Sequence, residues 1–149
     1  MKNYNIFKML FLVIIVSLLA LACKKVNTSV EKETPKFYGS LTVRSDGKDF
    51  TSENLAVQVA ADPSGKTMDM KLHKVKFVPA MPVRIDVTIP DITLEADGSF
   101  HGDNIVPYAL GGRPYPKYTV YGLEGKIKDG TLVFSLKFGN YPTTYSGKL

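Results

Sequence analysis

The sequence predicts an all-β protein, an antiparallel up-and-down barrel of about eight strands that follows an N-terminal export segment. From residue 37 onward, short runs alternate apolar and polar residues, a pattern typical of half-buried strands. Turn residues separate these runs at fairly regular intervals, and no run has the period of a helix. Because such a meander would leave two open edges, it must close or stack, and we expect a barrel rather than a flattened sandwich.

The clearest predicted strand covers residues 131–138, where every second residue is apolar. Another covers residues 83–89, beginning at Val83 on the inward face. In residues 68–78 the apolar positions change from even to odd near His73 and Lys74, which predicts a bulge or bend. The other predicted strands are residues 37–43, 55–59, 92–96, 99–105, 118–127 and 141–149, the last with Tyr141, Tyr145 and Leu149 on one face.

Turn-forming residues lie between these runs. Each turn contains glycine or asparagine, which tolerate positive φ, or a proline that fixes the corner. The predicted turns are residues 45–48, 62–65, 79–82, 97–98, 128–130 and 139–140.

Residues 1–22 are predicted to be a signal peptide. Lys2 and Lys8 form a positive n-region, and residues 9–22 follow as 14 almost uninterrupted apolar residues. This length suits the apolar core of a signal peptide and falls short of the ~20 residues that a membrane-spanning helix needs. An uncleaved signal anchor is the alternative.

The junction Leu19-Ala20-Leu21-Ala22-Cys23 resembles the lipobox of bacterial lipoproteins. The resemblance implies cleavage before Cys23, a diacylglycerol on its thiol and acylation of the new amino group. The protein would then attach to a membrane through its N-terminal lipid. Since Cys23 is the only cysteine, the mature chain would have no free thiol and no disulfide.

Residues 24–36 are polar, with two valines, and are predicted to be a flexible tether with a reach of about 20 Å. The folded domain is therefore expected at residues 37–149. The formal net charge is +5, and removal of Lys2 and Lys8 leaves +3. That charge is too small, and too mixed with acidic residues, for a nucleic-acid-binding surface.

Residues 38–43 (YGSLTV), 75–83 (VKFVPAMPV) and 132–140 (LVFSLKFGN) resemble the calycin-like β-barrel domain of bacterial lipoproteins. The resemblance extends over residues 37–149. It implies an eight-stranded lipocalin-type barrel, and it supplies no catalytic residues and no agreed ligand. The tryptophan signature of many lipocalins is absent, because the chain contains no tryptophan.

No motif predicts catalysis, metal binding or a cofactor. His73 and His101 are the only histidines, and neither has a partner at ligand spacing, although Asp97 and Asp103 flank His101. The chain contains no Gly-x-Ser-x-Gly elbow. We therefore expect no enzymatic activity, no bound metal and no cofactor.

Two regions are candidates for binding. In the loop of residues 106–117, Tyr108, Arg113 and Tyr115 would line the barrel mouth or meet a partner, unless the loop is only a stiff connection. The second candidate is the barrel interior, which would hold one small apolar ligand or be filled by its own side chains. Its inward-facing residues are Met68, Met70, Val83, Ile85, Val87, Phe134, Leu136 and Phe138.

The expected function is that of an anchored barrel that binds a small apolar ligand or a peptide. The alternative is a non-enzymatic structural or interaction module, with a filled barrel, in an envelope assembly. A lysine rather than an aspartate follows Cys23. By resemblance to bacterial sorting signals, this residue indicates the outer membrane. We expect the periplasmic face, and Glu31 and Glu33 leave display on the cell surface as the alternative.

Overall fold

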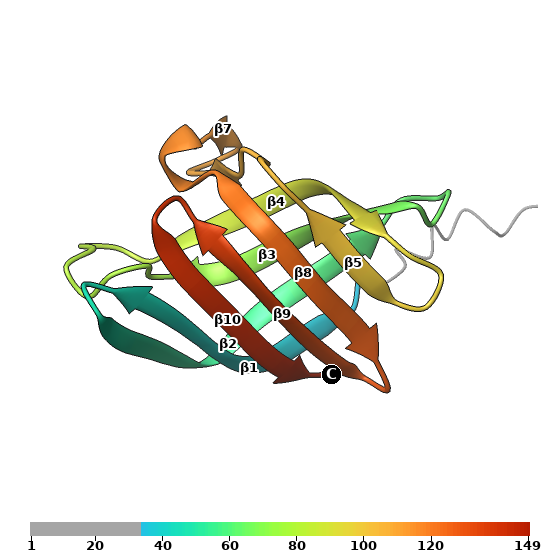
Figure 1. The fold of residues 1–149 in the computed structure, drawn as a ribbon, viewed down its shortest axis with the longest axis horizontal. Helices are drawn as coiled ribbons and strands as arrows, with labels where there is room; N and C mark the ends of the chain where they lie inside the picture. The colour runs from blue at the N-terminus through green and yellow to red at the C-terminus, as the bar shows by residue number, and fades with distance from the viewer. Residues whose placement is uncertain (1–33) are drawn as a thin grey trace, which may run out of the picture. The chain divides into compact units, whose positions relative to one another are not determined.

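The computed structural model describes residues 34–149, which form one compact unit and a closed antiparallel barrel of eight strands (Figure 1). The predicted fold class is confirmed. The predicted signal peptide, Cys23 and most of the tether lie outside the described residues. The barrel strands are β1 (Lys36–Ser45), β2 (Lys48–Ala61), β3 (Thr67–Val75), β4 (Ile85–Leu94), β5 (Ser99–Gly102), β8 (Val120–Lys128), β9 (Thr131–Phe138) and β10 (Tyr141–Lys148).

Neighbouring barrel strands pair in the order β3-β2-β1-β10-β9-β8-β5-β4, and pairing of β3 with β4 closes the ring. β5 is short and pairs with only two residues of β4, Thr93 and Leu94. Further along the same edge of β4, Val87 and Thr88 pair with β6 (Tyr108–Ala109). A small hairpin of β6 and β7 (Arg113–Pro114) thus lengthens the wall that β5 leaves short.

The two ends of the barrel differ in their connections (Figure 1). At one end, which we call the tight-turn end, the strands are joined by residues 62–66, 95–98 and 129–130. The described chain also enters β1 and leaves β10 there. At the opposite, long-loop end lie the two longest connections, residues 76–84 and 103–119.

Every barrel strand contributes buried apolar side chains to one continuous core. In β9 the alternation is strict, with Leu132, Phe134, Leu136 and Phe138 all buried, as the sequence predicts. Tyr145 of β10 is also buried, and its hydroxyl donates to the carbonyl oxygens of Phe37 and Leu55, which lie 3.0 and 3.1 Å away.

The predicted irregularity near His73 and Lys74 is confirmed. The β3–β4 register shifts between Leu72 and Val75, and Lys74 has a positive φ of 54°. The bulge exposes a backbone N–H at Lys74, which donates to Asp86 Oδ1 at 3.0 Å. Backbone amides at two other bulges are bonded in the same way. The Asp91 N–H donates to Asp69 Oδ1, and the Gly122 N–H donates to Asp103 Oδ1.

Two predicted orientations are wrong. β4 begins at Ile85, so Val83 belongs to the preceding loop, and its side chain is 58% exposed. Leu149 is 69% exposed although it shares the parity of the inward residues Thr143, Tyr145 and Gly147, because it follows the end of β10. In both cases the apolar alternation continues beyond the residues that pair with a neighbouring strand.

Candidate functional site

The predicted interior residues other than Val83 are all buried. They are Met68, Met70, Ile85, Val87, Phe134, Leu136 and Phe138, each between 0 and 7% exposed. A cavity large enough for a water molecule would give accessible area to the side chains around it. Four core residues have an exposed fraction of 0%, namely Met70, Leu72, Ile89 and Phe138. The barrel is therefore packed by its own side chains around these residues.

The long-loop end is closed by an aromatic cluster. Phe77 of the 76–84 loop stacks on Tyr118 with ring centroids 4.4 Å apart, and it meets Phe138 edge-on at 4.7 Å. Tyr115 stacks on the other side of this group, 5.1 Å from Tyr118, and Tyr141 lies 6.2 Å from Tyr118. Burial, together with the neighbouring Tyr115 and Tyr141, raises the pKa of Tyr118. These rings fill the position that the mouth of an open barrel would occupy.

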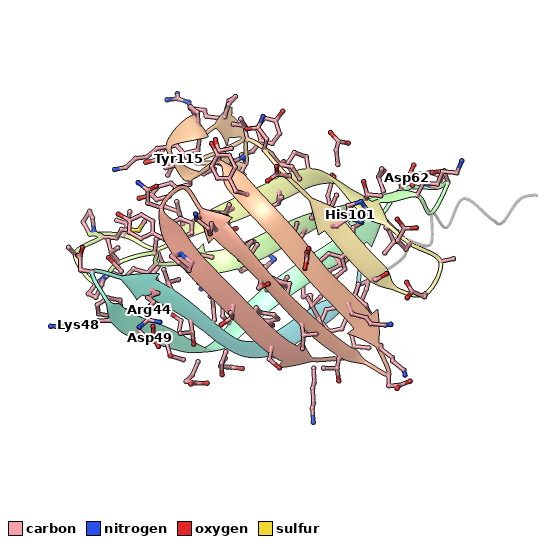
Figure 2. All side chains as sticks on the ribbon, viewed as in Figure 1. Arg44, Lys48, Asp49, Asp62, His101 and Tyr115 are labelled. Atoms are coloured by element: carbon pink, nitrogen blue, oxygen red, sulfur yellow. The ribbon has the colours of Figure 1, made fainter. Side chains whose placement is uncertain are left out.

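The loop predicted without strand structure is ordered by hydrogen bonds. It contains β6, β7 and a single 3-10 turn, η1 (Pro116–Tyr118). The three residues singled out there do not converge. Tyr115 packs in the aromatic cluster, whereas Tyr108 is 41% exposed and Arg113 is exposed on the hairpin. Figure 2 shows Tyr115 beside this hairpin, away from Lys48 on the β1–β2 turn.

Two surface depressions lie along β2, the larger of them at the long-loop end. The larger, of about 500 Å³, lies between the β1–β2 turn, the 76–84 loop and β10. Its lining residues are Ser45, Asp46, Lys48, Phe50, Val78, Pro79, Ala80 and Tyr141. The smaller, of about 340 Å³, lies between β2 and β3 and is lined by Glu53, Asn54, Leu55, Ala56, His73, Lys74 and Arg84. The sequence does not predict either one, since each combines residues from segments that lie far apart in the chain.

A polar network borders the smaller depression. His73 Nδ1 lies 3.5 Å from Asp86 Oδ2, and its Nε2 lies 3.2 Å from Gln58 Oε1. Partial burial of Asp86 tends to raise the pKa of its carboxyl group. The Lys74 N–H and the charges of His73 and Lys71 have the larger combined effect, so the pKa of Asp86 is lowered. Because Asp86 holds the β3 bulge, the network has a structural role.

The region around His101 has no metal-binding arrangement. His101 Nδ1 lies 3.8 Å from Glu95 Oε1. Asp97 instead accepts the Ser99 N–H at 2.9 Å, and Asp103 accepts the Gly122 N–H at 2.8 Å. Within residues 34–149, no three His, Cys, Asp or Glu side chains are grouped as a metal site would require. In the same range, no helix has the length and apolar character to cross a membrane.

The fold is similar to that of a solved protein from Bacteroides fragilis, provisionally described as an outer membrane protein, with a TM-score of 0.54. The sequences are 16% identical, and the match covers 78% of this chain and 51% of that protein. This chain thus spans about half the length of the protein it matches. No protein-family model and no curated protein sequence matches the chain. The similarity therefore concerns the fold.

Proposed function

We propose that this protein is a lipid-anchored binding module of the outer membrane, whose filled barrel presents its long-loop end to another protein. The observation that carries this proposal is the packed interior, with core side chains such as Met70 and Phe138 at 0% exposure. A filled barrel does not enclose a ligand, so binding would occur on its surface. A role in binding rather than catalysis is part of the proposal.

The position of the N-terminus supports the choice of end. Pro35 accepts a hydrogen bond from Val59 N–H at 3.2 Å, so the described chain begins at the tight-turn end. An anchor at Cys23 would attach there, leaving the long-loop end free. Loops on a rigid sheet are common sites of recognition, and both long connections lie at that free end.

The location rests on the lipobox-like junction before Cys23 and on the fold shared with the Bacteroides protein, which is provisionally described as an outer membrane protein. We propose attachment to the outer membrane on the periplasmic face, and membership of the calycin-like group. Replacement of Cys23 by alanine should release the protein from membranes. A Cys23→Ala variant that stays membrane-bound would contradict the anchor.

Site-specific photo-crosslinking in cells tests the binding role. A photoreactive amino acid at Ala80 or Leu110, both exposed at the long-loop end, should give adducts with protein. The matched control positions are Ser64 and Asp129, exposed in turns of the opposite end. The proposal would be contradicted if only the control positions gave adducts with protein, or if none of the four positions did.

A second candidate function rests on the larger depression. Its walls include Phe50, Val78 and Tyr141, and a volume of about 500 Å³ is within the range of small-molecule sites. A shallow surface site for a small apolar ligand is therefore the alternative. A ligand held there would contact the rim of the barrel and not Met68 or Met70.

A further inference from the structure

The wall of the barrel is incomplete between β2 and β3. β1 pairs with β2 as far as the Ser45–Lys48 turn, whereas β3 pairs with β2 only from Val57 to Ala61. Beyond Leu72, β3 bulges and pairs with β4 alone. On its β3 side, the stretch of β2 from residue 48 to residue 56 therefore has no paired strand among residues 34–149.

The free backbone groups of this edge can be assigned from the hairpin. A two-residue turn makes Ser45 and Lys48 a hydrogen-bonded pair, and such pairs alternate along an antiparallel ladder. The N–H and C=O groups of Asp49, Thr51 and Glu53 consequently point away from β1. An unpaired edge is a ready template for another strand.

Both depressions described above lie along this edge. The larger is at its Lys48–Phe50 end, opposite residues 78–80, and the smaller is at its 53–56 end, opposite Lys74 and Arg84. We call the space between β2 and residues 73–84 the slot. Figure 2 shows Arg44, Lys48 and Asp49 near the turn that connects β1 and β2.

We propose that the slot binds an extended peptide segment of a partner protein, which adds to β2 as an antiparallel or parallel strand. This inference rests on the proposed binding role and names the partner's chemistry. Backbone hydrogen bonds to Asp49, Thr51 and Glu53 would supply affinity, and the two depressions would accept side chains. At about 3.3 Å per residue, the edge accommodates roughly six to eight residues.

The side chains of the edge define the segment further. Phe50 lines the larger depression with Val78 and Tyr141, so it favours apolar side chains on that face of the segment. Asp49 and Glu53 point to the other face, where they favour basic or hydroxyl side chains, and Glu53 already accepts one such hydroxyl, that of Ser40 on β1. Asp49 also pairs with Arg44 at 3.7 Å, but both side chains are about 60% exposed, so this pair competes weakly.

The same charges disfavour a second copy of this chain as the occupant. Two antiparallel copies of β2 centred on Thr51 would place Asp49 of each copy opposite Glu53 of the other. Like charges directly opposite each other destabilise a strand pair. A segment from a different protein with basic residues at alternate positions avoids this repulsion.

The test is a selection of random ten-residue peptides, displayed on phage, against the full-length protein in detergent. Synthetic versions of the selected peptides are then bound to wild type, Thr51→Pro and Thr51→Val. Proline removes an N–H that faces the slot and leaves the β1–β2 ladder intact, since edge strands tolerate proline. Both variants lose the 2.9 Å hydroxyl contact with Thr42, so Thr51→Val is the matched control.

We expect selected peptides with apolar and basic residues in alternation, a loss of about tenfold in affinity for Thr51→Pro, and little change for Thr51→Val. Amide exchange at Asp49, Thr51 and Glu53 of the wild type should slow on binding, a readout that needs no variant. The proposal would be overturned if no peptides were enriched, if the amides of Asp49, Thr51 and Glu53 exchanged at the same rate with and without peptide, or if Thr51→Pro bound the peptides as tightly as wild type. Crosslinks at Leu110, outside the slot, report separately on the proposed binding role.

Discussion

The two ends of the barrel are closed by different physical means. At the tight-turn end, side chains bond to the backbone of short turns, as Asp62 Oδ1 does by accepting the N–H groups of Lys66 and Thr67. At the long-loop end, rings from three separate segments stack, with Phe77 and Tyr118 at the centre. Local hydrogen bonds fix a turn by itself, whereas aromatic packing depends on distant parts of the chain. The difference indicates that the conformation of the long-loop end is specified by tertiary packing rather than by local hydrogen bonds.

The largest expected effect is at the aromatic cluster. Phe77 is fully buried, so Phe77→Ala should destabilise the protein by about 3–5 kcal/mol, measured by urea unfolding of residues 34–149. The matched control is Val83→Ala in the same loop, which should cost less than about 0.5 kcal/mol because Val83 is exposed. Equal effects of the two changes would contradict closure by packing.

The next effect concerns Tyr145, whose hydroxyl bonds two backbone carbonyls in the core. Tyr145→Phe should cost about 1–2 kcal/mol, because these carbonyls lose their donor. The control is Tyr38→Phe on β1, where the ring is half exposed. A Tyr145→Phe variant as stable as the control would show that the buried hydroxyl contributes nothing.

Tyr145 also predicts a pH dependence. Burial raises the pKa of its hydroxyl to about 12, above the value of about 10 expected in the unfolded chain. The corresponding stability is present below pH 10 and is lost as the pH rises towards 12. Thermal unfolding across this range should show a steeper loss for wild type than for Tyr145→Phe. Parallel curves would contradict the assignment.

A smaller effect is expected where aspartates bond bulge amides. Asp69 accepts the Asp91 N–H at 3.1 Å, so Asp69→Ala should cost about 1 kcal/mol in unfolding free energy. Asp49→Ala, which removes only an exposed pair with Arg44, should change it by less than about 0.5 kcal/mol. If Asp49→Ala proves the more damaging, the bulge bond is not a stabilising feature.

The smallest effect concerns Asp97 at the tight-turn end. The hydroxyl and N–H of Ser99, followed by Lys126, lower the pKa of Asp97 to about 2. A lowered pKa adds stability above the unfolded value near 3.8, and this stability is lost as the pH falls towards 2. The advantage of wild type over Asp97→Asn should therefore shrink between pH 5 and pH 2. A difference independent of pH would contradict this.

Much of the barrel could be predicted from the sequence, because period-2 alternation directly reflects the two faces of a strand. Residues 131–138 were predicted with the bounds of β9, and the change of parity near His73 located a bulge. Alternation failed at Val83 and Leu149, where it extends past the paired residues. Strand pairing, not the local pattern, decides where a strand ends.

The surface features could not be predicted in the same way. Residues 106–117 carry no strand pattern, yet Tyr108 and Ala109 pair with β4, a contact that depends on β5 being short. The slot likewise results from a strand that is absent beside residues 48–56, and no local motif encodes such an absence. The sequence feature that comes nearest to predicting the larger depression is the connection of residues 76–84, which contains two prolines and the apolar Val78.

The most direct test of the central claim, that the barrel is filled and binding occurs on its surface, is native mass spectrometry of residues 34–149 purified without detergent. The protein should have the mass of the bare chain before and after extraction with organic solvent, and it should not take up a fluorescent fatty acid. An additional mass that disappears on extraction, together with uptake of the fatty acid, would contradict the account and identify a carrier.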